Sequence, residues 1–388
     1  MELYDKIRKL AFELGFADVG CARAQALSHL ETSHYREALS SGFFGRMEYL
    51  ARNTDKRDNP TLLLPGAKSV LVFLVPFSFF GDTLNASDDS PRAAPLASST
   101  LVKKEKLKVS EFALGSDYHT VIKERLNRIA NLIDRFPMEM EDSRSFKKYK
   151  SLTCRVFTDS APIMERAWAV RAGLGFIGKN NFLISRKCGV KNFIGVILTT
   201  VELPYYELFT NTALTRCETV NSLAEDSSAE KSEDKFYDVC GKCTRCLEAC
   251  TQKALFAPRR IDARKCLSYK TIEMPITEEN PSAEKINEEL SKKSTEEANS
   301  NVENKWIFGC DDCMNACPWN RLNLRGWEEF HTNAALLRSV VGSTKPAPGE
   351  TPEWWENLTH DEFDNYFKNS PLQRAGLTKI VHNLKRYE

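Results

Sequence analysis

The chain has 388 residues, of which 42% are hydrophobic and 28% charged, as in an ordinary globular protein. These proportions exclude a wholly disordered or collagen-like chain, and the longest apolar run, residues 69–80, is too short to cross a bilayer. The 54 basic and 53 acidic side chains leave a net charge of +1, which argues against a large basic face. No signal-peptide pattern opens the sequence, so we expect a cytoplasmic protein without membrane association.

The first 205 residues predict alternating helices and strands. Apolar residues at helical spacing predict an N-terminal helix that ends at Gly15, and further helices are predicted over residues 118–136 and 164–172. Residues 80–109 are polar and predict a surface loop. Strands are predicted at residues 16–22, 69–75, 155–157, 182–184 and 193–200. This alternation indicates a domain of the α/β (α+β) class.

Composition then divides the chain into four segments. We expect the α/β domain to occupy residues 1–220 and a polar linker to follow at residues 221–235. A cysteine-rich domain spans residues 236–320 and contains an exposed insertion, residues 277–304, which is rich in Glu, Lys, Asn and Ser. A helical segment, residues 321–388, completes the chain.

The cysteines are distributed very unevenly. Eight of the 12 lie between Cys240 and Cys317, and without an export signal such a cluster predicts metal binding rather than disulfides. Cys240, Cys243, Cys246 and Cys250 have the C-x2-C-x2-C-x3-C spacing of bacterial ferredoxins, in which the fourth thiolate binds the other of two clusters. A second copy is split, with Cys266 displaced from Cys310, Cys313 and Cys317.

Crossed ligation predicts two [4Fe–4S] clusters with no cysteine of the eight left over. The first cluster takes Cys240, Cys243, Cys246 and Cys317, and the second takes Cys250, Cys266, Cys310 and Cys313. A pair of structural zinc sites is the alternative, because C-x2-C pairs also bind zinc. Two clusters beside a large α/β domain favour a redox enzyme over a simple electron carrier.

Several segments, in the same order along the chain, resemble epoxyqueuosine reductases. They are Asp-Ser-Ala-Pro at residues 159–162, the glycine-rich residues 171–180, residues 266–273, residues 309–320 and, more weakly, residues 369–374. The resemblance implies reduction of epoxyqueuosine to queuosine at the tRNA wobble position. It also implies a nitroreductase-like domain that binds cobalamin, followed by a ferredoxin-like domain with two clusters.

The resemblance assigns Asp159 as the proton donor for the oxygen released from the epoxide. We expect this side chain to be buried, because burial raises the pKa of a carboxyl group. The alternative is that Asp159 caps a helix over residues 161–172, since Asp-Ser-Ala-Pro is a favourable helix start.

Other cobalamin contacts follow only from the resemblance. They are Arg57, Lys179, Asn180 and Leu183 in the first domain, and Ser268, Glu273 and Asp311 beside the cluster ligands. Asp117 and His119 begin like the D-x-H-x-x-G motif that ligates cobalt, but Ile122 replaces the glycine. We therefore expect base-off cobalamin without a histidine ligand, with Tyr118 and His119 facing the substrate, although Asp117 could instead cap a helix.

The implied partners are tRNA and a low-potential electron donor such as flavodoxin or ferredoxin, and we expect a monomer. Basic residues at 103–108, 259–265 and 379–386 are candidates for phosphate contacts, although such runs are also common on solvated surfaces. Two other functions stay open at this point. One is a corrinoid reductive dehalogenase acting on a small molecule, and the other is a ferredoxin-type carrier with an accessory domain.

Overall fold

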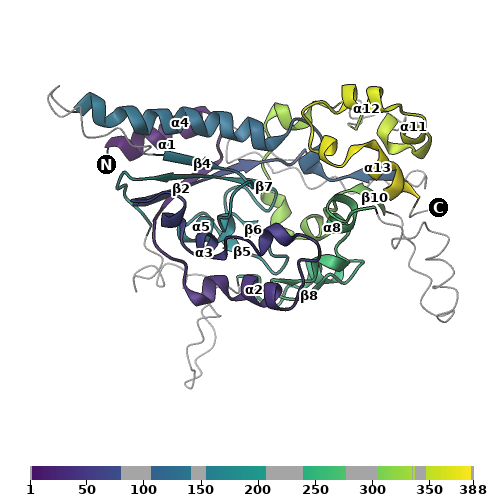
Figure 1. Cartoon of the computed structure of the whole chain (residues 1–388), viewed down its shortest axis with the longest axis horizontal. Coiled ribbons are helices and arrows are strands. Elements are labelled where there is room, and N and C mark those ends of the chain that lie inside the picture. The colour runs from purple at the N-terminus through teal and green to yellow at the C-terminus, as the bar shows by residue number, and fades with distance from the viewer. Residues whose placement is uncertain are drawn as a thin grey trace, which may run out of the picture.

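A four-stranded antiparallel sheet forms the centre of the first half of the chain (Figure 1). Its strands, in spatial order, are β1 (Asp18–Arg23), β2 (Ser69–Pro76), β7 (Asn192–Thr199) and β4 (Cys154–Phe157). All three pairings are antiparallel, which places the domain on the α+β side of the predicted class. The computed structural model describes residues 2–79, 106–140, 154–206, 239–276, 304–333, 335–336 and 347–385.

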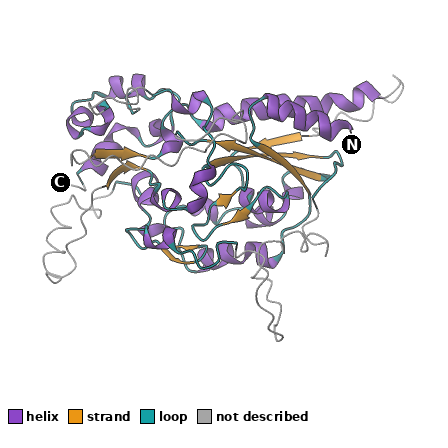
Figure 2. Ribbon diagram, turned by 180° about the vertical axis from the view of Figure 1, so that it is seen from behind, coloured by secondary structure: helices purple, strands orange, loops and turns teal. Residues whose placement is uncertain are grey.

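Helices cover both faces of this sheet (Figures 1 and 2). On one face, α1 (Glu2–Glu13) and α4 (Tyr118–Met140) bury Ile7 and Ile129 against Phe73. On the other, α5 (Glu165–Arg171) buries Trp168 against Val72. Successive strand residues point to opposite faces, so every residue of β2 is buried. This explains why its sequence is a continuous apolar run.

The predicted elements of this domain are confirmed within a few residues, with additional short ones between them. The additional elements are α2 (His29–Ser40), α3 (Thr54–Asp58), β5 (Phe176–Ile177), and the 3₁₀ turns Glu48–Leu50 and Pro60–Leu62. The predicted strand near residue 183 is β6 (Leu183–Ile184), which pairs with β5. The predicted helix at 164–172 begins at Glu165, with Met164 at its N-cap.

The predicted surface loop at residues 80–109 is wrong at its end. Residues 106–109 form β3 (Lys106–Val109), which pairs in parallel with β10 (Asn304–Phe308) from the far side of the cysteine-rich segment. A polar sequence can form a strand where a distant partner supplies the hydrogen bonds, and local pattern does not reveal that partner. Residues 80–105 lie outside the described residues.

The cysteine-rich segment folds from short elements beside the sheet domain (Figure 1). They are α7 (Arg245–Glu248), β8 (Leu255–Ala257), β9 (Arg260–Ile261), α8 (Leu267–Ile272) and α10 (Asp312–Asn315). The expected linker, residues 221–235, lies outside the described residues. So does the expected insertion, apart from Asn304, which begins β10.

The C-terminal segment is helical, as predicted. Its helices are α11 (Pro352–Glu356), α12 (His360–Tyr366) and α13 (Gly376–Leu384). They bury Trp355, Phe367 and Ile380 against Ile307 and Phe308 of β10, so the tail packs on the cysteine-rich segment. Across the described ranges, none of the helices has the length and apolar character needed to span a membrane.

Candidate functional site

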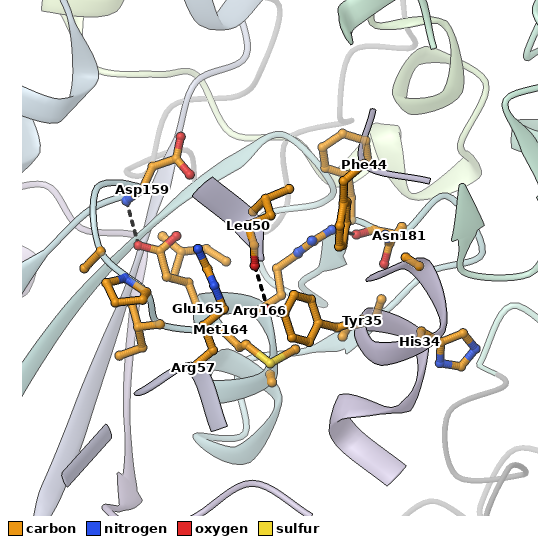
Figure 3. A pocket seen from close by; sticks show the side chains of 18 of the residues that line it. His34, Tyr35, Phe44, Leu50, Arg57, Asp159, Met164, Glu165, Arg166 and Asn181 are labelled. Carbon is orange, nitrogen blue, oxygen red and sulfur yellow. Dashed lines mark hydrogen bonds between the residues drawn. The ribbon is translucent and has the colours of Figure 1, made fainter. Parts of the chain in front are cut away.

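A cavity of about 890 Å³ opens between α2, α5 and the β8–β9 hairpin (Figure 3). Side chains from both halves of the chain line it, and they include Arg57, Asp159, Glu165, Arg166, Arg259 and Glu273. A volume of this size is in the range of pockets that bind cofactors and other small molecules.

A second cavity of about 440 Å³ adjoins the first. It lies between the start of α4, the end of α8 and the tail residues 369–374. Five residues line both cavities, namely Tyr118, His119, Asp159, Glu273 and Arg374. A group bound in the larger cavity and one bound in the smaller cavity would therefore share Asp159 between them.

Asp159 follows β4 and has a left-handed backbone, with φ of 50°, which is uncommon for a residue other than glycine. The Tyr118 hydroxyl donates to Asp159 Oδ2 at 2.7 Å. The Asp159 amide donates to Glu165 Oε1 at 2.7 Å, as Figure 3 shows. The expectation of burial is wrong, because the Asp159 side chain is 63% exposed. The helix-cap alternative is also wrong, because α5 begins six residues later.

The nearby Glu165 is more buried than Asp159. This side chain keeps some solvent contact through the open cavity, but protein surrounds it on its other sides. The resulting desolvation, together with the Asp159 carboxylate, raises the pKa of Glu165. The Asp159 amide, Arg166 and Lys123 act in the opposite direction. The two carboxyl groups therefore differ in environment, one exposed and one desolvated.

Tyr118 and His119, at the start of α4, both lie beside Asp159. The Tyr118 ring stacks between His119 and Phe193, at centroid distances of 4.1 and 4.2 Å. His119 Nδ1 lies 2.7 Å from Asp117 Oδ1, and its Nε2 lies 3.8 Å from Asp159 Oδ2. Burial, reinforced by the Asp159 carboxylate, raises the pKa of Tyr118, so its hydroxyl remains a hydrogen-bond donor.

Asp117 has the local geometry of a cap as well as a histidine partner. Its Oδ1 accepts the His119 amide at 2.9 Å. Burial opposes the shift, but these hydrogen bonds from His119 lower the pKa of Asp117 below its usual range. Asp117 thus stays ionised and fixes the orientation of the His119 ring.

The structure brings three of the expected cobalamin contacts to the cavity walls, namely Arg57, Asp159 and Glu273. Arg57 Nη2 donates to the Tyr49 carbonyl at 3.1 Å, while its Nε is buried with no hydrogen-bond partner in the described structure. A buried donor without a partner is costly. Its position in the cavity wall suits a ligand that carries a carbonyl or amide oxygen.

The other expected contacts do not line either cavity. Asn180 is buried and donates to the Cys313 carbonyl at 3.4 Å, and Lys179 donates to the Gly241 carbonyl. Leu183 is a buried residue of β6, and Ser268 lies in α8. The Asp311 carboxylate is buried, where it accepts from the Ser110 hydroxyl and from the Glu111 amide at 2.8 Å.

The eight clustered cysteines fall into two neighbouring groups. Cys317 lies within electrostatic range of Cys240, Cys243 and Cys246. Cys313 lies within range of Cys250 and Cys266, and more weakly of Cys246 in the first group, and it is also the thiol neighbour of Cys310. The described cysteines form no disulfide. In the same ranges, no three or more His, Cys, Asp or Glu side chains surround a point that would hold a single ion. The chemistry of four thiols per group fits a [4Fe–4S] cluster.

Several residues that line the cavities were not predicted from the sequence, and they include Tyr49, Glu165 and Arg374. Glu165 follows the Asp-Ser-Ala-Pro segment by three residues, and Arg374 ends the segment 369–374, so both were close to recognised motifs. Tyr49 lies in a 3₁₀ turn (Glu48–Leu50), and no local sequence pattern marks it.

The basic residues that were candidates for phosphate contacts lie in different environments. Arg259 lines the larger cavity, while Lys379 is buried against the Met274 carbonyl. Lys103 and Arg386 lie outside the described residues.

Two groups of cysteine thiols, in a chain that also has a large cavity lined by carboxylates, are typical of an iron–sulfur oxidoreductase. Residues 239–320 match the model of a 4Fe–4S double cluster binding domain, and residues 57–160 match the model "Epoxyqueuosine reductase QueG, DUF1730". The chain is 32% identical to an epoxyqueuosine reductase of Cyclobacterium marinum, over 98% of this chain and 96% of the relative. The chain belongs to the epoxyqueuosine reductase family.

Other relatives agree. The chain is 31% identical to an epoxyqueuosine reductase of Leadbetterella byssophila, over 99% of this chain and 98% of the relative. The fold matches that of epoxyqueuosine reductase from Streptococcus thermophilus with a TM-score of 0.63 and 22% identity, over 100% of this chain and 81% of that one. It also matches an epoxyqueuosine reductase solved with an epoxyqueuosine-modified stem loop of tyrosine tRNA. In that case the TM-score is 0.64 at 21% identity, over 99% of this chain and 80% of that one.

Proposed function

We propose that this chain reduces epoxyqueuosine to queuosine at the wobble position of tRNA, the last step of queuosine biosynthesis. The observation that carries the proposal is the position of Asp159, whose carboxyl group borders both cavities beside Tyr118 and His119. Membership of the family supports the same reaction. Removal of the epoxide oxygen takes two electrons and two protons and releases that oxygen as water.

We assign cobalamin to the larger cavity, bound base-off without a histidine ligand from the protein. The orphaned Arg57 Nε in the cavity wall supports a ligand rich in amide oxygens. His119 supports the absence of a histidine ligand, because Asp117 holds its Nδ1 and its Nε2 faces Asp159. When bound, cobalamin supplies a low-potential cobalt centre that accepts electrons and acts as a nucleophile.

We divide the other expected cobalamin contacts into residues that line the cavity and residues that lie behind its wall. Arg57 and Asp159 are in position to touch a ligand in the larger cavity directly, and Glu273 lies where this cavity meets the smaller one. We assign Lys179, Asn180, Leu183, Ser268 and Asp311 to the layer behind it, because they connect the cavity region to the cluster segments. The Asn180 bond to the Cys313 carbonyl and the Lys179 bond to the Gly241 carbonyl support this assignment.

Residues of the chain supply the proton that the released epoxide oxygen needs. Asp159 donates to the oxygen released from the epoxide, since an alkoxide needs a proton as the carbon–oxygen bond breaks. Tyr118 and His119 hold the Asp159 carboxyl at the boundary of the cavities. We assign the electrons to a path through the two [4Fe–4S] clusters from a flavodoxin or ferredoxin, in a monomeric cytoplasmic enzyme.

The test is direct conversion. Protein with both clusters and cobalamin is incubated anaerobically with epoxyqueuosine-containing tRNA and a strong reductant, and the nucleosides are analysed by mass spectrometry. We expect a product that has lost one oxygen atom, formed only when cobalamin is present. Unchanged epoxyqueuosine with fully loaded protein would overturn the proposed substrate.

A further inference from the structure

Three side chains from distant parts of the chain meet where the two cavities join. Tyr49 comes from the 3₁₀ turn Glu48–Leu50, Glu273 caps the end of α8, and Arg374 ends the 3₁₀ turn Pro371–Arg374 of the tail. Glu273 and Arg374 line both cavities, and Tyr49 lines the larger one. We call these three residues the boundary cluster.

Contacts within the boundary cluster give it a defined geometry. Arg374 Nη2 lies 2.9 and 3.2 Å from the two Glu273 carboxylate oxygens, and Glu273 and Arg374 both lie within electrostatic range of Tyr49. Tyr49 is within electrostatic range of Asp159. The Tyr49 residue is 44% exposed and the Arg374 side chain 63% exposed, so a ligand in the cavity can reach both.

The tail segment that carries Arg374 is anchored to the start of α4. The Asp117 amide donates to the Asn369 carbonyl at 2.5 Å, and Asn369 adopts a left-handed backbone with φ of 60°. The Asn369 amide in turn donates to Gln373 Oε1 at 3.3 Å. Because Asp117 directly precedes Tyr118, these bonds fix the position of Arg374 relative to Asp159.

The chemistry of the boundary cluster matches one class of ligand. The Watson–Crick edge of a guanine-type base presents two adjacent N–H donors, N1 and N2, beside the O6 acceptor. A carboxylate can accept from the two donors, a guanidinium can donate to O6, and an aromatic ring can stack on the base face. Enzymes that act on a base inside a folded nucleic acid extract it and bind it in this manner.

We propose that the boundary cluster binds the guanine-type base of the substrate nucleoside, with Glu273 on N1–H and N2–H, Arg374 on O6 and Tyr49 stacked on the ring. This inference rests on the proposed function, and it places the base where the two cavities join, beside the cofactor in the larger one. The ion pair already orients Glu273 and Arg374 before the base enters. Placed in this way, the modified side of the base extends towards Asp159.

Binding of short anticodon hairpins tests the inference independently of turnover. Cluster- and cobalamin-loaded protein is titrated with three hairpins that differ only at the wobble position, which carries guanosine, inosine or adenosine. Inosine lacks the N2 amino group, so it isolates the contact to Glu273. We expect guanosine to bind about tenfold more tightly than inosine, the size of one specific base contact. We expect adenosine to bind more weakly still.

The variants separate the three contacts. Glu273→Gln should bind guanosine and inosine hairpins equally, and Arg374→Ala should weaken both by a similar factor while sparing adenosine. Tyr49→Ala should weaken all three hairpins about tenfold through lost stacking, whereas Tyr49→Phe, which keeps an aromatic ring, should recover most of this loss. Lys368→Ala, which removes an exposed charge from the same tail, is the matched control and should change nothing.

Three results would overturn the inference. Equal weakening of all three hairpins in Arg374→Ala would make Arg374 a phosphate contact. Loss of cobalamin from Glu273→Gln with preserved discrimination would return Glu273 to the cofactor. A wild-type protein that converts modified tRNA without distinguishing guanosine from inosine would refute this inference alone. Discrimination without conversion would refute the proposed function alone.

Discussion

The Tyr118 hydroxyl donates a hydrogen bond of 2.7 Å to Oδ2 of Asp159. The Tyr118 ring stacks between the rings of His119 and Phe193, so its hydroxyl is held in place. That hydroxyl fixes the position of the Asp159 carboxyl group, which is otherwise largely exposed. Asp159 thus takes its position from a tyrosine on another element and not from burial.

Replacing Asp159 by Asn should abolish most turnover while leaving the cofactors in place. The amide cannot donate a proton as an acid does, and general acid catalysis typically contributes a factor of about 10²–10⁴. Single-turnover assays measure the rate, and absorption spectra with cobalt and iron analysis measure the cofactors. The exposed Asp364→Asn is the control. A ferredoxin-type carrier would tolerate Asp159→Asn.

Tyr118→Phe should reduce turnover while preserving stability. The ring can still stack between His119 and Phe193, but Asp159 loses the hydroxyl that orients it. We expect kcat to fall about tenfold, a cost typical of one lost hydrogen bond to a charged group, with KM and melting temperature close to wild type. A large fall in melting temperature would instead assign Tyr118 a structural role.

Glu165 should make stability depend on pH. Desolvation and the Asp159 carboxylate raise the pKa of Glu165 from 4.5 to about 8 in the folded protein. Its contribution to stability is therefore fully present below pH 4.5 and is lost as the pH rises towards 8. Glu165→Gln does not titrate and keeps an oxygen for the Asp159 amide.

Thermal unfolding at pH 5 and pH 8 checks this prediction. The melting temperature of Glu165→Gln should rise relative to wild type as the pH increases across that range. Glu356→Gln, at an exposed position, should show no such trend. A constant difference between Glu165→Gln and wild type would show that Glu165 is ionised throughout.

Crossed ligation makes a specific prediction for Cys317. Cys317→Ser should disturb the cluster held by Cys240, Cys243 and Cys246, because Cys317 neighbours those thiols. Cys310→Ser should disturb the other cluster. Iron content with electron paramagnetic resonance distinguishes the two, and the reverse pattern would refute the crossed assignment.

A buried ion pair between Arg171 and Glu31 supports the fold. Arg171 donates to both oxygens of Glu31 at 2.6 Å, and it also donates to the Gln25 and Ala26 carbonyls. The two side chains are only 10% and 7% exposed. Arg171→Met should lower the free energy of unfolding by about 3–5 kcal/mol, because it leaves a buried carboxylate unpaired.

The exposed pair Lys6–Glu2 provides the comparison for this measurement. Lys6→Met should cost about 1 kcal/mol or less, because solvent screens an exposed pair. Chemical denaturation of the two variants measures both values. Equal losses would show that the burial of Arg171 and Glu31 does not determine the strength of their interaction.

Local pattern was sufficient to predict the elements that pack against the sheet. The apolar run of β2 and the helical spacing of α1 and α4 reflect burial of one face or both, and the structure confirms all three. Strand β3 escaped prediction because its partner β10 follows about 200 residues later in the chain. Pairing over that separation leaves no periodic trace in a four-residue polar segment.

Sequence motifs identified residues of the candidate site but did not reveal how buried each of them is. Asp159 was identified, but its exposure was not, because exposure depends on how the loop after β4 meets α4 and α5. The desolvated carboxyl group is instead that of Glu165, which accepts a hydrogen bond from the Asp159 amide of this loop. Tyr49 and Arg374 come together only through the fold, since 325 residues separate them in the sequence.

The pairing of β3 with β10 also constrains the order of events during synthesis. When β3 leaves the ribosome, the strand that completes it has not yet been translated. At ordinary rates of about 5–20 residues per second, the interval is on the order of 10–40 s. The open edge of β3 therefore needs protection in the nascent chain, and folding of the segment around Ser110 and Glu111 must wait until Asp311 emerges.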